Sequence, residues 1–342
     1  MPEGDTVAWT AARLHRALAG QVLTGCELRW PSLATRDLTG STTLEVVAAG
    51  KHLLHRLDSG VTLHSHLRMD GTWRIRPPDE PISRHHLIRA VLQTQRATAI
   101  GRALGMLDLV PTSQEHLLVG HLGPDILADG FDAAHVAGRV GGRRELEGQD
   151  VHGAIESGGT GEELGHVVTQ DAIPDRAARL GDDPADHRER HPAAGQAAGP
   201  LSERRPLALV LLDQQVLAGL GTFWVSEALF ALQVHPWRAS ADVPTPQVER
   251  VLDWARRRML VSARTGIQTA TGHHQEGSLG AVHARSGRPC RRCGQGVRVA
   301  LVGDAPRERT IFYCPACQGG LAPGDDGRPQ APLGARRRRT TR

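Results

Sequence analysis

The first twenty residues carry the hydrophobic spacing of an amphipathic helix. Apolar residues recur at intervals of three or four, which places them on one helical face: Val7, Ala11, Leu14 and Leu18. Asp5 or Thr6 is suited to cap the start of this helix, and Gly20 is suited to end it. The pattern therefore predicts a helix over residues 5–19.

Short apolar or alternating runs then follow as far as about Arg102, separated by turn residues such as Asp58-Ser59-Gly60. No helix-length crossover separates these runs, so we expect an antiparallel β-sandwich with Lys51 on a hairpin turn. The predicted strands span residues 21–30, 43–49, 52–57, 61–67, 72–75 and 87–94.

The pattern changes in the middle of the chain. No Phe, Trp or Tyr occurs between Asp132 and Thr222, and residues 137–205 show no usable period, which predicts a long and mostly disordered connector. Helical periodicity returns over residues 207–215, 222–232 and 247–264.

Gly219-Leu220-Gly221 separates the first two of these helices, and Thr222 is suited to cap the second. Two interpretations stay open here. The free amides of a glycine-rich turn before a helix can bind a phosphate, or the turn is only a packing joint between two helices.

Four of the five cysteines form two Cys-x-x-Cys pairs with twenty residues between them: Cys290, Cys293, Cys314 and Cys317. This spacing is typical of a tetrahedral zinc site. The segment is too short to build a hydrophobic core alone, so the metal would supply its fold. A role in holding a partner and a purely structural role are both compatible with the spacing.

Composition limits the class of protein. No run of 18 apolar residues and no signal-peptide core follows Met1, which favours a soluble cytoplasmic protein with no membrane partner, and the unpaired Cys26 fits a reducing compartment. Net charge is +4 and the pI is about 9.1. We expect residues 323–342, which include the run Arg336–Arg339, to be a disordered basic tail that is either solvated or binds phosphates.

The chain has two aliphatic amines of chemical interest. Lys51 is the only lysine among 41 basic residues, and a lysine can exchange a proton where an arginine cannot. Removal of Met1 would leave Pro2 as a secondary amine, which is less basic than lysine and can form an iminium ion with an aldehyde-level carbon. Glu3 could then move protons. This opening is commonplace when taken alone.

The ordered combination of motifs is specific. Pro2-Glu3-Gly4, Gly50-Lys51-His52, His66-Leu67-Arg68-Met69-Asp70-Gly71, Gly219-Leu220-Gly221 and Arg309-Thr-Ile-Phe-Tyr-Cys314 occur together with the first cysteine pair. In this combination the chain resembles the bifunctional DNA glycosylase family of formamidopyrimidine-DNA glycosylase and endonuclease VIII. The resemblance covers roughly residues 1–135 and 206–320.

The resemblance implies a multidomain α+β fold. A catalytic β-sandwich with an N-terminal helix would span residues 1–136, a helix–two-turn–helix domain residues 206–283, and a zinc finger with one structural Zn²⁺ residues 284–322. The implied activity is excision of an oxidised base followed by strand nicking, with damaged double-stranded DNA as the partner of a monomeric enzyme.

The resemblance also implies roles for individual residues. Pro2 would attack C1′ of the damaged nucleotide, Glu3 would protonate the opening sugar, and Lys51 would bind the adjacent phosphate and assist proton transfer. Base excision and Schiff-base formation would be followed by β- and δ-elimination. DNA would be held by Arg68, Met69, Gly219, Gly221, Thr222 and Arg309, with Met69 as the wedge that fills the space of the flipped base.

Some positions depart from the family pattern. Thr6 replaces a usual glutamate, for which Asp5 is a possible substitute, and Thr222 replaces a usual asparagine. The connector is also much longer than the family hinge. A catalytically impaired DNA-binding protein with the same fold therefore stays an alternative, whereas a generic zinc-ribbon scaffold would not account for the N-terminal motifs.

Two further features bear on specificity and metals. The stretch 266–282 lacks the long loop that covers oxidised purines, which favours the endonuclease VIII branch and oxidised pyrimidines as substrates. Six histidines raise the question of a second metal site, but their scatter on alternating strand faces favours a structural role: His52, His55, His64, His66, His85 and His86.

Overall fold

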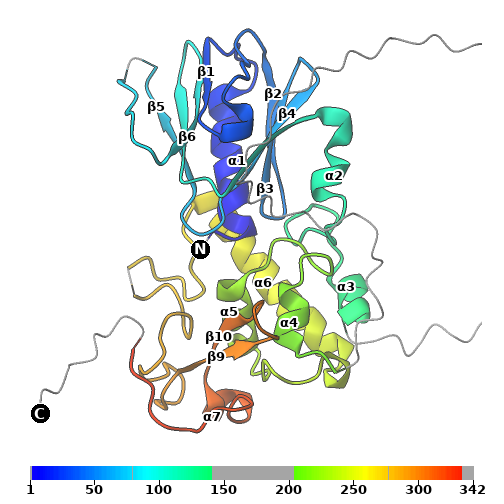
Figure 1. Cartoon of the computed structure of the whole chain (residues 1–342). Helices are drawn as coiled ribbons and strands as arrows, with labels where there is room; N and C mark the ends of the chain where they lie inside the picture. Colours follow the sequence, from blue (N-terminus) through cyan, green and yellow to red (C-terminus); the bar gives the residue numbers. More distant parts are fainter. Residues whose placement is uncertain (1, 79, 141–203, 276, 333–342) are drawn as a thin grey trace, which may run out of the picture. The chain divides into compact units, whose positions relative to one another are not determined.

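The computed structural model describes residues 2–78, 80–140, 204–275 and 277–332 (Figure 1). Most of the predicted connector and the run Arg336–Arg339 lie outside these ranges. Within them, no helix combines the length and the hydrophobicity that a membrane crossing requires.

Two antiparallel four-stranded sheets form the N-terminal part. Their strand orders are β2-β3-β4-β8 and β1-β6-β7-β5. The strands are β1 (Gly25–Leu28), β2 (Thr43–Ala49), β3 (His52–Leu57), β4 (Val61–His66), β5 (Thr72–Arg76), β6 (Ile88–Gln93), β7 (Thr98–Arg102) and β8 (Met106–Pro111). The predicted sandwich is confirmed, but β7 and β8 were not among the predicted strands because neither segment alternates clearly.

Helix α1 (Gly4–Leu18) supplies the core between the sheets. Figure 1 shows it running between the strands of the two sheets, and its apolar face packs with buried strand residues such as Leu53 and Leu92. Its buried apolar positions are the predicted ones: Val7, Ala11, Leu14 and Leu18. Full burial of one such side chain stabilises a fold by about 1.5–3 kcal/mol.

The second core is helical. It is built around α5 (Thr222–Ala231), which is buried on nearly all sides, and around one face of α6 (Thr245–Thr265). The other helices are α2 (His116–Val119), α3 (Ala133–Val140) and α4 (Leu207–Leu212), and single 3₁₀ turns cover Pro31–Leu33, Thr112–Gln114 and Ser240–Asp242. Because α3 packs in this core, the boundary predicted at residue 136 falls inside a helix.

The last part is a hairpin of β9 (Arg298–Val302) and β10 (Arg309–Tyr313), followed by α7 (Pro315–Gln318). The buried Glu227 on α5 holds the preceding segment. Its carboxylate accepts hydrogen bonds from the amides of Ala281, Val282 and His283 at 2.8–2.9 Å. A buried carboxylate with three backbone donors fixes the segment that leads to the first cysteine pair and the hairpin.

Residues 323–332 are part of this fold and not of a disordered tail, which corrects the sequence prediction for these residues. The Asp325 carboxylate pairs with the guanidinium of Arg298 and accepts a hydrogen bond from the Tyr313 hydroxyl at 2.7 Å. Gln330 also exchanges two hydrogen bonds with the backbone of Val299. Such long-range pairing of polar groups has no signature in hydrophobic periodicity.

We predict that Asp325→Ala lowers the free energy of unfolding by about 3 kcal/mol, because it leaves the buried Arg298 without its partner. Asp326→Ala should change it little, since Asp326 and Arg328 form an exposed pair. Urea unfolding of both variants measures the difference. Equal stability of Asp325→Ala and the wild type would contradict the assigned role of this pair.

The Arg298 guanidinium lowers the pKa of Asp325 to about 2. The stabilisation from this carboxylate is therefore present above its unfolded pKa and is lost only as the pH falls toward 2.

Candidate active site

Glu3 joins the two ends of the candidate site. Its buried carboxylate accepts hydrogen bonds from the amides of Gly221, Phe223 and Trp224 at 2.9, 2.7 and 3.4 Å. These amides open α5, so Glu3 caps a helix that begins far away in sequence, and the helix dipole favours a negative charge there. The prediction that Thr222 caps α5 is wrong. Thr222 is the first residue of the helix, and the N-cap position is Gly221, which has no side chain.

Close backbone approach explains the glycines at this junction. The Gly4 amide donates to the Gly219 carbonyl at 2.9 Å, and Gly219 has a φ of 98°. A Cβ on Gly4 would lie 2.8 Å from the Gly219 Cα, and a Cβ on Gly221 would lie 2.4 Å from the Glu3 Cδ. The glycine-rich turn therefore receives the start of the chain, and its Gly221 amide is already bound to a carboxylate.

Burial raises the pKa of Glu3 to about 7, although the positive charge of Lys51 and the helix amides oppose this rise. The carboxyl group consequently exchanges a proton near neutral pH. A group with such a pKa is suited to donate a proton in one step and accept one in another.

Lys51 lies against the same turn. Its ammonium donates to the carbonyl of Leu220, which also accepts from the Gln214 amide at 2.9 Å. Gly50 has a φ of 56°, and its amide donates to the Asp125 carboxylate at 2.7 Å, which fixes the turn that presents Lys51. Sequence reasoning missed Asp125 and Gln214, because neither belongs to a recognisable motif.

Charge also connects Lys51 to a residue of the C-terminal hairpin. Burial lowers the pKa of the Lys51 ammonium, the Glu3 carboxylate opposes this effect, and Arg309 adds to it. Arg309 begins β10 and is exposed. The fold thus brings Glu3, Lys51 and Arg309 into one electrostatic environment.

Pro2 is half-buried and directly precedes the anchored Glu3. Its nitrogen is therefore held at the same junction. Asp5 has a different place from the one expected. Its buried carboxylate accepts from the Ser262 hydroxyl at 2.5 Å and from Gln268 at 3.2 Å, so it ties α1 to α6 and does not cap α1.

The loop between β4 and β5 presents Met69. This side chain is 62% exposed, so it is not a core methionine. Arg68 beside it has a φ of 49°, and its amide donates to His66 Nδ1 at 2.9 Å. The Gly71 amide closes the turn on the Leu67 carbonyl.

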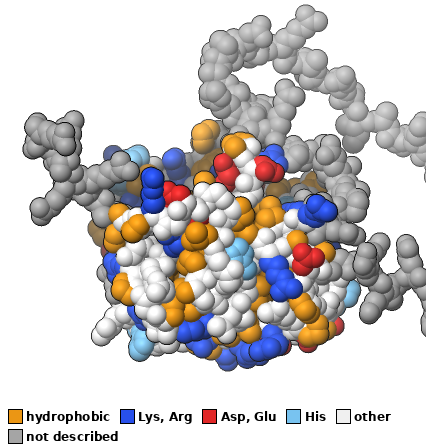
Figure 2. Space-filling view, turned by 90° about the horizontal axis from the view of Figure 1, so that it is seen from below, with side chains coloured by type: hydrophobic (Ala, Val, Ile, Leu, Met, Phe, Trp, Pro, Cys, Tyr) orange, Lys and Arg blue, Asp and Glu red, His pale blue; other side chains and the backbone are white. Residues whose placement is uncertain are grey.

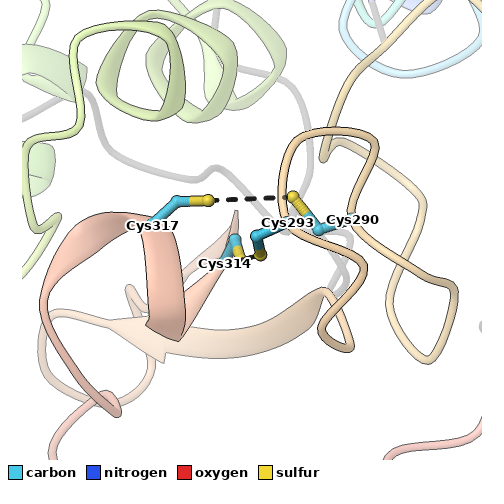
Figure 3. A group of neighbouring side chains, drawn as sticks. All are labelled: Cys290, Cys293, Cys314 and Cys317. Atoms are coloured by element: carbon cyan, nitrogen blue, oxygen red, sulfur yellow. Dashed lines mark hydrogen bonds between the residues drawn. The ribbon is translucent and has the colours of Figure 1, made fainter.

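The four predicted metal ligands meet beside the C-terminal hairpin, with one pair before β9 and the other after β10 (Figure 3). Their sulfur atoms all lie within 4.8 Å of one another, with Sγ–Sγ distances of 3.9 Å for Cys290–Cys317 and 3.5 Å for Cys293–Cys314. A tetrahedron with Zn–S bonds of 2.3 Å has sulfur atoms about 3.8 Å apart, so the four thiols fit this metal.

The arginines near the cysteines differ in their contacts. Arg292 donates to the carbonyls of Phe230 and Ala231 at 3.0 and 3.3 Å and stacks on the Phe230 ring, so it caps the end of α5. Arg291 donates to the Gly277 carbonyl. The contacts of Arg292 therefore give it a structural role at this end of α5.

Figure 2 shows the face at the bottom of Figure 1, where Lys and Arg side chains are dispersed among hydrophobic ones and acidic side chains are few. The basic groups on this face do not merge into one continuous patch.

The histidines are not scattered as the sequence suggested. The register of β3 and β4 places His52 opposite His66 and Leu54 opposite His64, so His52, His64 and His66 share one face. His55 lies on the other face, where it contacts the Thr43 hydroxyl.

Comparison with known proteins agrees with this arrangement. Residues 1–105 match the formamidopyrimidine-DNA glycosylase N-terminal domain, and residues 180–273 match the formamidopyrimidine-DNA glycosylase H2TH domain.

Named relatives extend over almost the whole chain. A protein named probable endonuclease 8 2 of Streptomyces coelicolor is 38% identical over 96% of this chain and 98% of its own length. A Mycolicibacterium smegmatis protein named DNA-(apurinic or apyrimidinic site) lyase Nei2 is 33% identical over 93% and 99%. A formamidopyrimidine-DNA glycosylase of Paracoccus denitrificans is 26% identical over 93% and 100%.

Solved structures share the fold. The Lactococcus lactis formamidopyrimidine-DNA glycosylase, crystallised with DNA that contains an abasic site, aligns with a TM-score of 0.64 at 19% identity. The alignment covers 93% of this chain and 100% of that one.

The chain therefore belongs to the formamidopyrimidine-DNA glycosylase and endonuclease 8 family. The higher identity to relatives named endonuclease 8 places it in that branch, as the short 266–282 stretch predicted.

The raised pKa of Glu3 makes a prediction about pH. Because the pKa of Glu3 in the folded protein lies above its ordinary value of 4.5, the folded state binds more protons than the unfolded state between about pH 4.5 and 7. Wild-type stability should therefore fall across this window relative to Glu3→Gln, which does not titrate. Urea unfolding at several pH values measures the difference, and parallel pH profiles for the two proteins would refute the assignment.

Proposed function

We propose that this protein is a bifunctional DNA glycosylase and abasic-site lyase that removes oxidised bases and nicks the strand. The observation that carries the proposal is the junction of Glu3 with α5. It holds the nitrogen of Pro2, a carboxyl group that titrates near pH 7, and the only lysine of the chain in one place.

The chemistry follows from these groups. Once Met1 has been removed, the lone pair of the Pro2 nitrogen attacks C1′ of the damaged nucleotide. The C1′–base bond breaks, and the base leaves with the bonding electrons and takes up the proton that the Pro2 nitrogen loses. Glu3 donates a proton to the ring oxygen as the C1′–O4′ bond opens, which leaves an iminium ion between Pro2 and C1′.

The iminium ion then accepts electrons during strand scission. Loss of a proton from C2′ sends an electron pair toward the iminium nitrogen and expels the 3′-phosphate, which is β-elimination. A second elimination expels the 5′-phosphate. Water finally adds to the iminium carbon and releases the Pro2 amine, while Lys51 holds a phosphate next to the lesion and assists proton transfer.

Separate elements would hold the DNA. The exposed Met69 would enter the stack in place of the flipped base, with Arg68 beside it. Arg309 supplies a planar guanidinium that can bind phosphate oxygens in pairs. The turn at Gly219–Gly221 would anchor the start of the chain instead of a phosphate, because it binds Gly4 and Glu3. The half-exposed Thr222 at its end would be the position that contacts a phosphate.

We further propose that Zn²⁺ occupies the cysteine cluster and acts only on structure. Cys314 directly follows β10, which begins at Arg309, so the metal would fix the direction of β10 and of that arginine. Zinc in a site with four thiolate ligands has no open position for a substrate.

The branch supports oxidised pyrimidines as the preferred bases. Relatives named endonuclease 8 match this chain best among those compared above, and the chain has only a short segment over residues 266–282. A monomer in the bacterial cytoplasm would suffice for this chemistry, since all proposed groups come from one chain.

The reactive amine provides the main prediction. Borohydride should trap the protein covalently on duplex DNA that contains an abasic site or thymine glycol only when Pro2 is the first residue. A protein with a retained N-terminal tag should not be trapped, and protease removal of the tag to expose Pro2 should restore trapping. The tagged protein is the matched control, because its folded core is the same.

Two outcomes would contradict this assignment. Trapping that is equal with and without the tag would exclude the N-terminal amine. Salt-sensitive duplex binding with no trapping of the untagged protein would instead support the impaired DNA-binding alternative.

Removal of the metal should act on binding before chemistry. We expect one Zn²⁺ per chain by elemental analysis, and its loss in the Cys290→Ser, Cys293→Ser double variant. That variant should bind duplex DNA at least ~10-fold more weakly, because the C-terminal hairpin that carries Arg309 loses its fold. Cys26→Ser, a change outside the cluster, is the control. Full DNA affinity without bound zinc would overturn the structural role.

A further inference from the structure

Three histidines that the proposed chemistry does not use lie beside the Lys51 turn. His52 begins β3 and His66 ends β4, and the two residues are paired across the strands. His64 lies two residues before His66 on the same face and is fully buried. A buried imidazole is a costly group to retain unless both ring nitrogens have partners.

These ring nitrogens belong to a histidine relay, a series of hydrogen bonds that joins His52, His64 and the carboxylate of Asp108. His52 Nδ1 lies 2.8 Å from His64 Nε2, and His64 Nδ1 lies 2.9 Å from the Oδ2 of Asp108 on β8. The His64 side chain is 1% exposed, whereas that of Asp108 is 40% exposed. The histidine relay therefore runs from the exposed Asp108, through the buried His64 ring, to His52, the residue that follows Lys51.

For a neutral His64 ring, this geometry determines where the protons are. An ionised carboxylate only accepts, so His64 must donate through Nδ1 to Asp108. In a neutral His64 ring the Nε2 atom is then an acceptor, and His52 donates to it through Nδ1. The remaining nitrogen of His52, Nε2, keeps its lone pair.

The tautomer of the third ring, His66, is set by a backbone contact. His66 Nδ1 accepts the amide hydrogen of Arg68, so a neutral His66 carries its proton on Nε2. The His52 and His66 rings contact each other at a centroid distance of 5.0 Å and an interplanar angle of 82°. Burial lowers the pKa of His52 to about 3 and that of His66 to about 4, so both rings are neutral at neutral pH.

We propose that Asp108 and His64 fix His52 in the Nδ1–H tautomer, and that His52 in this form is a positioning residue that aligns the Lys51 turn with the Arg68–Met69 loop. This inference rests on the proposed function for its catalytic meaning. Without the Asp108 acceptor, His64 and His52 can both reverse their protons. The His52 ring, which contacts His66 edge to face, would then carry its proton on Nε2, and the changed contact between the two rings would disturb the alignment of the two loops.

Nitrogen-15 NMR of histidine-labelled protein tests the tautomers directly. Long-range couplings between ring hydrogens and nitrogens should show protonated Nδ1 and bare Nε2 in both His52 and His64. This pattern should be lost in Asp108→Ala and kept in Asp108→Asn, whose amide oxygen still accepts. A protonated Nε2 on His52 in the wild-type protein would overturn the proposal.

Single-turnover cleavage of an abasic-site duplex tests the positioning role. Asp108→Ala and His52→Ala should slow strand scission at least ~10-fold, the size of effect found when the hydrogen-bond partner of a metal-ligating histidine is removed. Asp108→Asn should remain near the wild-type rate. His55→Gln is the control, because it alters the contact of another buried β3 histidine with Thr43, outside the histidine relay.

The possible outcomes separate the hypotheses. Two results would show that the histidine relay only stabilises the sheet and would overturn the proposal. One is a wild-type cleavage rate in Asp108→Ala, and the other is an equal loss of rate in His55→Gln and Asp108→Ala. If the wild-type protein itself neither cleaves nor is trapped, the proposed function fails, and the NMR pattern still decides whether the histidine relay exists.

Discussion

The binding of the Glu3 carboxylate to the first amides of α5 is the contact around which the candidate site is arranged. It joins residues more than two hundred positions apart and satisfies amides that would otherwise be buried without acceptors. It requires glycine at positions 4 and 221, where a Cβ would collide with the partner segment. It also determines where Pro2 lies, since Pro2 is covalently attached to the anchored residue.

The same carboxyl group is part of the structure and of the proposed chemistry, and these two roles are compatible. A protonated carboxyl group keeps a carbonyl oxygen that accepts hydrogen bonds, so Glu3 can hold a proton and still bind some of the α5 amides. Burial and the proximity of Asp5 favour the proton, whereas Lys51 and the amides favour the charge. The balance of these opposing effects lies near neutral pH, where a proton donor is useful.

Local patterns predicted the elements but not their long-range contacts. The helical spacing from Val7 to Leu18 and the alternation of the first strands were sufficient to locate α1 and β2–β4, and the cysteine spacing was sufficient to locate the thiol cluster. Periodicity could not show that Glu3 caps α5, that Asp5 binds Ser262, or that Asp325 holds Arg298, because each contact depends on how distant segments pack. The histidine cluster was missed for a different reason, since it required the register between β3 and β4.

Peptide mapping of the borohydride-trapped complex tests the central claim most directly. The chain has only two aliphatic amines, the N-terminus and Lys51. After nuclease digestion and cleavage at the basic residues, mass spectrometry should find the sugar remnant on the peptide that runs from Pro2 to Arg13. A remnant on Lys51, seen as an uncleaved peptide from Asp37 to Arg56, would contradict the account.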